Sequence, residues 1–222
     1  MWGREVDGKV LTFRLAGINN QNFLMRDEET GTYWQQISGL AIAGPLKGKQ
    51  LAFIPWDEIS FGIWRQESPN GTVLLPVAEF KGDYAKQDWD KAMAKTRTVV
   101  DTSKTGIAPR ELMVGVQIGA ASRAYAMAKI VSEKLVLGQL GGKPVLLLLG
   151  PDGKSVRGFT TPGDFYRREG ALMMDAESGS EWNFKGCAIA GPRIGQCLTT
   201  VPVVKDYWFD WRAYHPDTSV YR

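Results

Sequence analysis

Residues 24–51 read LMRDEETGTYWQQISGLAIAGPLKGKQL, and residues 172–198 read LMMDAESGSEWNFKGCAIAGPRIGQCL, so one segment occurs twice in the chain. When one residue within Gln35–Ser38 is skipped, 14 of 27 aligned positions are identical. The offset between the copies is 148 before the gap and 147 after it, and the second offset continues downstream to Val73 and Val220. A long-period repeat of this kind indicates one structural unit used twice in pseudo-twofold packing, and not a solenoid.

The composition favours β structure. The chain has 222 residues, of which 44% are hydrophobic, and it contains eight tryptophans and 25 glycines. Such numbers suit a turn-rich, aromatic-packed sheet protein better than a helical bundle. We therefore expect an α+β, β-rich fold made of two pseudo-symmetric repeated units of antiparallel strands with short helices.

Charge and hydropathy argue against two classes of partner. The net charge is +3 and the charges are scattered, so no basic stripe exists to follow a nucleic-acid backbone. The longest apolar run, Val145–Leu149, has five residues, which is far too short for a membrane span. The first ten residues lack the apolar core of a signal peptide. Because the repeat places Met1 inside a unit, that absence says little about export.

The second copy is preceded by material that the first lacks. Residues 111–150 read as strand, short helix (within 122–134) and strand, and a hairpin turn follows at Asp152-Gly153-Lys154. Only that turn has a counterpart before the first copy, at Asp7-Gly8-Lys9. A longer parent would carry the missing strands before Met1; alternatively, the extra strands of the second unit complete both halves. The expected domains are a truncated N-terminal unit at 1–76, a helical linker at 77–110 and a complete second unit at 111–222.

Three helices are expected besides the one within 122–134. One short helix in each unit, Asp57–Gln66 and Asp206–Tyr214, stops before a proline, because the residue before proline disfavours helical angles. A strand should follow each of these helices. In the linker, Asp83 can cap a helix over Tyr84–Lys95.

Two acid pairs are the best-placed polar groups, Asp27 with Glu29 and Asp175 with Glu177. The pattern D-x-E-[TS]-G-x-x-W could hold a cation or a general acid beside an aromatic wall. It also fits a turn in which the aspartate accepts backbone hydrogen bonds, glycine supplies positive φ and tryptophan fills the core. Turn chemistry accounts for most of the residues and is preferred, and the four acids are retained as candidate ligand-binding residues.

The only two cysteines, Cys187 and Cys197, lie in the second copy, on either side of AIAGPRIGQ. This hairpin-like stretch would place them opposite each other, and both are replaced together in the first copy, by Leu40 and Gln50. A cross-strand disulfide is the favoured interpretation, ahead of two buried free thiols. Zinc is not expected, because the chain has one histidine and no CxxC.

Trp208 and Arg212 lie one helical turn apart in the aromatic run Tyr207–Arg212. Core packing is the preferred interpretation of this run, and a ligand or partner surface is the alternative. His215, just before Pro216, is expected to cap the helix rather than to act as a catalyst.

No cofactor is expected. The run Gly150–Ser155 lacks the first glycine of a phosphate loop, since position 148 is Leu148, and a strand-like segment follows it where the motif needs a helix.

The run MRDEETGTYWQQISGLAIAGPLKG, followed by Pro55, Trp64 and Pro69, resembles a family of bacterial and archaeal proteins of unknown function, number 3179. The family pattern is roughly D-x-x-T-G-S-x-W-x-Q, then A-I-x-G-P-x-x-G, then a W-x-x-W helix that ends at proline. In the second copy ASRAYAMAKI resembles the upstream A-Y-P segment of the family, with Ala126 in place of the proline. The likeness covers most of the chain outside the linker.

The resemblance implies no established activity. Many members of that family carry export signals, which suggests a periplasmic or extracellular location, and some carry a reactive cysteine on the strand before the first hairpin. The corresponding strand here, Val145–Gly150, has no cysteine. The expected function is therefore a non-enzymatic domain of an exported bacterial protein that binds a small molecule or a protein in a groove between its two units. The alternative is a thiol or redox enzyme whose reactive segment is missing or degenerate in this chain.

Overall fold

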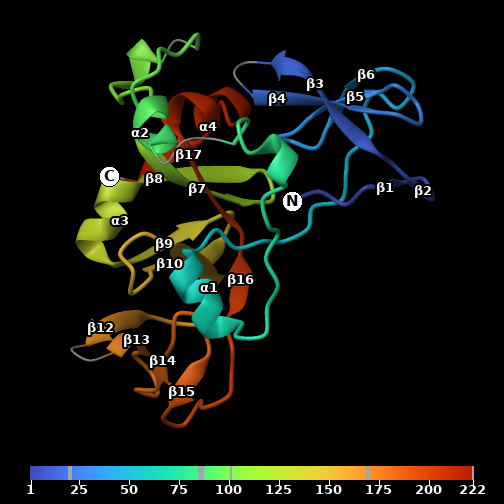
Figure 1. The fold of residues 1–222 in the computed structure, drawn as a ribbon. Coiled ribbons are helices and arrows are strands. Elements are labelled where there is room, and N and C mark those ends of the chain that lie inside the picture. The colour runs from blue at the N-terminus through green and yellow to red at the C-terminus, as the bar shows by residue number, and fades with distance from the viewer. Residues whose placement is uncertain (20–21, 85–87, 101, 169–170, 222) are drawn as a thin grey trace.

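The computed structural model describes residues 1–19, 22–84, 88–100, 102–168 and 171–221, and its fold is α+β and β-rich (Figure 1). Two four-stranded sheets form the centre. One has the strand order β16-β11-β10-β9 and the other β17-β7-β8-β18. Their pairings are antiparallel except that β18 runs parallel to β8. The bounds are β7 Leu112–Ile118, β8 Ala121–Ala126, β9 Leu135–Leu140, β10 Lys143–Leu149, β11 Val156–Thr160, β16 Thr199–Val201, β17 Val203–Tyr207 and β18 Ser219–Tyr221.

The main core lies between these two sheets. Buried residues from both, among them Val114, Tyr125, Leu147 and Val201, form one cluster. Helix α3 (Met127–Glu133) follows β8 and adds Ile130 to this cluster. The burial of these apolar side chains is the main stabilising contribution to the fold.

The chain passes from one central sheet to the other at Pro202. Strand β16 pairs with β11, and β17, which is separated from β16 by Pro202 alone, pairs with β7. Proline has no N–H to donate to a ladder, so the pairing is interrupted there and the chain can change sheets.

Two smaller sheets share one design and lie on different sides of the central sheets (Figure 1). Their strand orders are β3-β4-β5-β6 and β12-β13-β14-β15. Met25 pairs with Trp34 in the first, and Met173 pairs with Trp182 in the second. The bounds are β3 Phe13–Asn19, β4 Asn22–Asp27, β5 Tyr33–Gln35, β6 Ala41–Ala43, β12 Phe165–Arg168, β13 Ala171–Asp175, β14 Glu181–Trp182 and β15 Ala188–Ala190, and the hairpin β1 (Glu5–Val6) and β2 (Lys9–Val10) precedes the first sheet.

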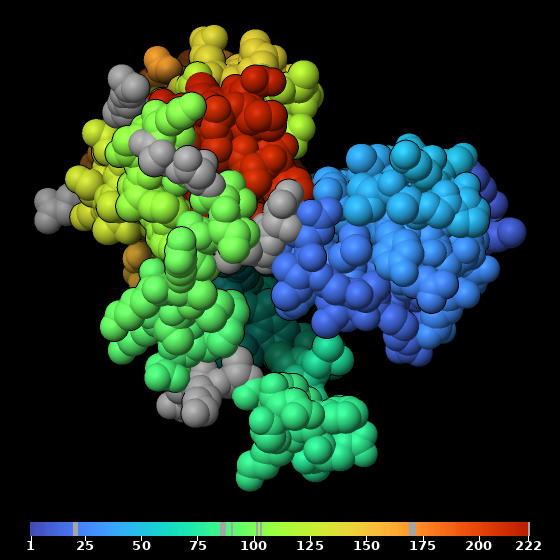
Figure 2. Space-filling view, turned by 90° about the horizontal axis from the view of Figure 1, so that it is seen from above, coloured from blue at the N-terminus to red at the C-terminus, as the bar shows by residue number. Residues whose placement is uncertain are grey.

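The two expected short helices are present and pack in different places. Helix α4 (Trp208–Tyr214) covers the outer face of β7 and β8. Helix α1 (Phe61–Glu67) inserts Ile63 into a cluster built from the second half of the chain, including Phe159 and Trp182. The N-terminal part of the chain thus supplies a piece of the core of the C-terminal part. Figure 2 shows that the N-terminal sheet itself, in blue, forms a separate lobe beside the main body.

The expectation of a helix within 122–134 is right only in its second half. Residues 121–126 form strand β8, and α3 begins at Met127. Alanine favours helix, but Ala124 and Tyr125 are both buried, one against α4 and the other in the main core. Pairing with β7 on one edge and β18 on the other overrides the local propensity.

The linker is less helical than expected. Short helices are described at η1 (Ala78–Phe80), α2 (Trp89–Met93) and η2 (Ser103–Thr105). Part of the expected helix, residues 85–87, lies outside the described residues. The strand expected after the helix forms only in the second unit, as β18, whereas residues 71–77 have no regular structure. No helix in the described part of the chain is long and apolar enough to cross a membrane.

Candidate functional site

The two aspartates of the repeated motif are buried and bonded inside their own turns. Asp27 accepts the Trp34 indole N–H through Oδ2 at 2.8 Å and the Thr30 backbone N–H through Oδ1 at 2.5 Å. Asp175 makes the same two contacts with Trp182, at 2.9 Å, and Ser178, at 2.6 Å. The structure therefore gives both aspartates the role of a turn anchor that holds a core tryptophan.

These hydrogen bonds decide the charge of the aspartates. Burial disfavours their ionised form, but the tryptophan N–H and the turn donors outweigh it, so the pKa of Asp27 and that of Asp175 are both lowered. The two carboxylates are charged at neutral pH. Their contribution to stability is lost only as the pH falls through the lowered pKa values.

The two glutamates of the motif lie at the surface. Glu29 accepts the backbone N–H of Thr12 at 2.8 Å, and Glu177 pairs with Arg193. Asp27 and Glu29 also line a surface hollow of about 490 Å³, together with Arg14 and Arg26. The sheets that carry the two acid pairs are separate, so the structure does not bring Asp27 and Asp175 together.

Helix α4 carries the other two candidates. Trp208 is buried against Met113 and Ala124, and its indole donates to Thr105 Oγ1 at 2.8 Å. Arg212, on the same helix, is half-buried. The core-packing interpretation of Trp208 is therefore the one that the structure shows.

The expected disulfide is present. Cys187 and Cys197 are bonded, with Cα atoms 4.0 Å apart, across an antiparallel bridge. The first unit has an antiparallel bridge at the equivalent place, between Leu40 and Gln50. Cys187 is half-buried and Cys197 is exposed.

A pocket lies at the seam between the N-terminal and C-terminal halves of the chain. The sequence did not indicate which residues would line it. It has a volume of about 250 Å³ and is called here the seam pocket. One wall comes from the N-terminal half, and the other comes from β11 and the junction of β16 and β17. Its lining is Pro55, Trp56, Asp57, Arg157, Gly158, Thr200, Val201, Pro202 and Val203.

Arg157 fixes this seam. Its buried guanidinium donates to Asp57 Oδ2 at 2.7 Å and to both carboxylate oxygens of Glu67 at 2.8 Å, and it stacks on Phe184. Burial disfavours the charged form, but the hydrogen bonds to Glu67 and Asp57 outweigh it and raise the pKa of Arg157. A second contact across the same seam joins Lys205 to Glu58 at 3.1 Å.

Two further carboxyl groups, the half-buried Asp206 near the end of β17 and the buried Asp210 in α4, form an acid pair. Burial, and then the charge of Asp210, raises the pKa of Asp206 to about 8. The pKa of Asp210 is raised as well, again chiefly by burial. Asn22, from the N-terminal sheet, donates a short hydrogen bond to Asp210, and Tyr214 donates to the carbonyl of Asn19 at 3.2 Å. The acid pair thus holds a proton at neutral pH and lies where the N-terminal lobe meets α4.

His215 lies at the C-terminal end of α4, as the sequence predicts. The backbone N–H of His215 donates to Trp211 O at 2.9 Å, which closes α4, and its ring stacks on Trp211 at 3.7 Å. Burial lowers its pKa. Within the described ranges, His, Cys, Asp and Glu side chains form no group of three or more suited to a metal ion.

Sequence reasoning missed the seam pocket and the acid pair. Arg157 and Asp57 are 100 positions apart, and no local pattern joins them. A signal for the acid pair did exist: at the offset of 147, Asp206 and Asp210 correspond to Ile59 and Ile63. Both positions change together, which is the same signal that identified the cysteines.

The comparison with protein families extends over nearly the whole chain. Residues 1–218 match the family model described as "Protein of unknown function (DUF3179)". The chain belongs to this family. No curated protein and no solved structure matches it. DUF3179 membership agrees with the resemblance seen in the repeated motif and assigns no activity, so the function has to be argued from the geometry.

Proposed function

We propose that this DUF3179 protein is a non-enzymatic binding domain of an exported bacterial protein and that a small ligand occupies the seam pocket. The observation that carries the proposal is the pocket's place. It is formed jointly by residues 55–57 of the N-terminal half and the β16–β17 junction of the C-terminal half. This position supports the expected groove between the two units, although the sequence did not indicate its lining residues, and pockets between structural units are frequent ligand sites.

The chemistry of the pocket favours a small ligand with an ammonium group. Arg157 lines the pocket, but its guanidinium N–H groups are already bonded to Asp57, to Glu67 and to the Phe184 carbonyl, so it has little to offer an anion. Half of the Asp57 side chain is exposed, so it is open to a ligand as well as to Arg157. Trp56 also lines the pocket, and an indole face attracts a cation. An anionic ligand would find no free guanidinium here, because Arg157 is already bonded to Asp57 and Glu67.

The ligand class can be tested by NMR on the indole N–H signals of the ¹⁵N-labelled protein. The Trp56 signal is assigned with Trp56→Phe, and n-butylammonium, butyrate and n-butanol are titrated as probes of equal size and different charge. We expect n-butylammonium to shift the Trp56 signal to saturation and butyrate to leave it unchanged. Asp57→Asn should remove the shift, whereas Asp7→Asn, on the β1–β2 hairpin, should keep it.

Two results would contradict the proposal. One is a Trp56 signal that responds to none of the three probes, and the other is a response to n-butylammonium that Asp57→Asn does not change. The redox alternative is tested separately by the reactivity of Cys187 and Cys197. Rapid exchange of their disulfide with glutathione, with a thiol of low pKa, would favour that alternative, and an inert disulfide favours the binding domain.

Export is supported by the disulfide and by the family resemblance. A bond between Cys187 and Cys197 is expected to persist in an oxidising compartment. Fractionation of the natural host, with detection of the protein outside the cytoplasm, tests this part of the proposal.

We also propose that the chain consists of two tandem, partly truncated copies of one unit, divided at 1–76, 77–110 and 111–222. The shared strand order, the paired Asp–Trp turns and the two equivalent bridges support this. Limited proteolysis should cut first within 77–110. Because α1 contributes to the core of the second unit, the two pieces should stay associated after cleavage.

Ligand binding at the acid pairs, Asp27 with Glu29 and Asp175 with Glu177, is a second proposal. The hollow lined by Asp27 and Glu29 supports a contact with a ligand at the first loop. Glu29→Gln, measured in the same titrations, distinguishes the hollow from the seam pocket. The substitution should weaken binding only if the ligand occupies the hollow.

A further inference from the structure

In the second unit, α4 and β18 form one surface that a β-hairpin covers. Trp208 and Trp211 are buried with Met113 of β7 and Ala124 of β8, and Val220 packs against the same cluster. Strand β18 pairs in parallel with β8, so the hairpin also satisfies its backbone groups.

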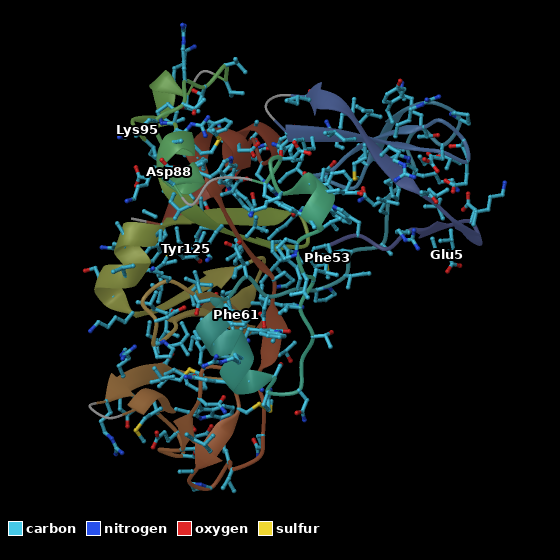
Figure 3. All side chains as sticks on the ribbon, in the orientation of Figure 1. Glu5, Phe53, Phe61, Asp88, Lys95 and Tyr125 are labelled. Atoms are coloured by element: carbon cyan, nitrogen blue, oxygen red, sulfur yellow. A yellow bond between two sulfur atoms is a disulfide. The ribbon has the colours of Figure 1, made fainter. Side chains whose placement is uncertain are left out.

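The equivalent surface of the first unit is largely uncovered, although its Trp64 is half-buried. At the offset of 147 its residues are Phe61, Trp64, Val73 and Leu74, and this set is called the α1 face. Phe61 is 60% exposed, Val73 51% and Leu74 101%. Phe61 and Trp64 stack on each other, and Phe61 lies on α1 near the middle of the view in Figure 3. An isolated exposed apolar residue is ordinary, but a set that repeats a buried cluster elsewhere in the same chain indicates a binding surface.

The backbone beside this face is also unpaired. Residues 72–74 correspond to β18, yet residues 71–77 form no strand in the described structure. Among the described residues, no backbone hydrogen bond is made by residues 72–75. An extended segment with free N–H and C=O groups can accept an added strand.

The α1 face is held in a fixed position. Ser60 caps the helix by accepting the N–H of Ile63, and Ile63 is buried on the opposite side with Phe159 and Trp182. Arg157 binds Glu67 at the end of the helix. The face is therefore presented by a helix whose other side is already packed, and its binding would need little rearrangement.

We propose that the α1 face is the docking surface for a β-hairpin of the β7–β8 type, supplied by a partner polypeptide. The hairpin would lay its apolar face on Phe61 and Trp64 and pair its second strand in parallel with residues 72–74. A partner that offered only an apolar surface would leave the backbone of that segment unpaired.

The second unit also specifies the chemistry of that hairpin. A Cβ on Gly115 of β7 would lie 2.1 Å from the Trp211 ring, so the strand that meets the indole must carry glycine at this place. Ala124 shows that the neighbouring strand needs a small residue. A second copy of this chain is not the expected occupant, because its own β7–β8 hairpin is already paired with β17 and β18.

This inference is independent of the proposed ligand. No residue of the α1 face lines the seam pocket, so either proposal can fail alone.

The test uses the full chain and a fluorescent peptide with the sequence of residues 111–127, joined end to end because an isolated hairpin is only marginally stable. We expect saturable binding by fluorescence anisotropy and slower hydrogen exchange at residues 72–75. Leu74→Asp and Val73→Asp should each weaken binding at least tenfold. Ile194→Asp, at an apolar position on another hairpin whose exposure of 67% lies between those of Val73 and Leu74, should not change it. A peptide with valine in place of its Gly115 should not bind.

Absence of binding would overturn the proposal. So would binding that survives Leu74→Asp, because the peptide would then occupy another place, such as that of the chain's own β7–β8 hairpin. Dimerisation of the chain that Leu74→Asp abolishes would also overturn it, since the occupant would then be a second copy. Because Leu74 is fully exposed, its variant should fold normally, and an unchanged Tm checks this.

Discussion

Replacement of Asp206 by asparagine should remove a loss of stability that the wild-type protein shows as the pH rises from 5 to 8. The ordinary pKa of an aspartate is 3.8, and that of Asp206 in the folded protein is about 8. Between these values the folded protein holds a proton that the unfolded chain has lost. The stabilisation from this proton is complete below the ordinary pKa, and it is lost as the pH rises through the raised one.

The size of the effect follows from the number of protons involved. One proton gives a slope that approaches 1.36 kcal/mol per pH unit, so the free energy of unfolding should fall by at most about 4 kcal/mol from pH 5 to pH 8. Asparagine keeps the shape of the side chain and an oxygen that can accept the Tyr207 N–H, but it does not titrate. The variant should therefore match the wild type near pH 5 and exceed it at pH 8.

Urea unfolding at several pH values, followed by tryptophan fluorescence, measures this difference. Burial lowers the pKa of His215, which acts on stability in the opposite direction, so the comparison is made between wild type and variant, in which its effect cancels. Asp7→Asn, at an exposed position, is the matched control. Parallel curves for wild type and Asp206→Asn would refute the reasoning, because they would show that Asp206 is charged in the folded protein.

Three further outcomes are expected. Trp34→Ala and Trp182→Ala should each lower the free energy of unfolding by about 3–5 kcal/mol, measured in urea, because each removes a buried indole from the core; a loss below 1 kcal/mol would contradict the burial. Reduction of the bond between Cys187 and Cys197 should lower the free energy of unfolding by roughly 2–3 kcal/mol at most, because the bond closes only a short loop. Thermal unfolding with and without reductant measures this loss. Arg157→Leu should cost about 2–4 kcal/mol and increase proteolysis near α1, since it leaves two carboxylates without their partner; unchanged protection of α1 would show that this ion pair does not hold the seam.

The parts of the fold that could be predicted depend on local chemistry. The Asp27 and Asp175 turns each use a carboxylate, a small hydroxyl residue, a glycine and a tryptophan within eight positions, so the sequence alone shows what each residue does. The disulfide was predictable for a related reason, because a hairpin brings its two ends together. In both cases the repeat supplied a second example of the same geometry.

The parts that could not be predicted depend on contacts between distant segments. The alanines of β8 favour a helix until β7 and β18 are present on either side. The seam pocket exists only because residues 55–57 lie against β11 and the β16–β17 junction, which no periodicity encodes. The acid pair lies between these two cases. Its residues are four positions apart in the sequence, but their raised pKa values depend on burial, and the contact of Asp210 with Asn22 depends on the position of the N-terminal lobe.

The equivalent bridge in the first unit bears on how the disulfide forms. Leu40 and Gln50 approach each other across the same backbone geometry with no sulfur present, so the hairpin does not depend on a covalent link for its shape. Cys187 and Cys197 are thus brought together by folding, at a high effective concentration of one thiol near the other. We therefore expect a chain with both cysteines reduced to reach the same hairpin, with oxidation following folding. The bond secures an arrangement that the backbone has already adopted.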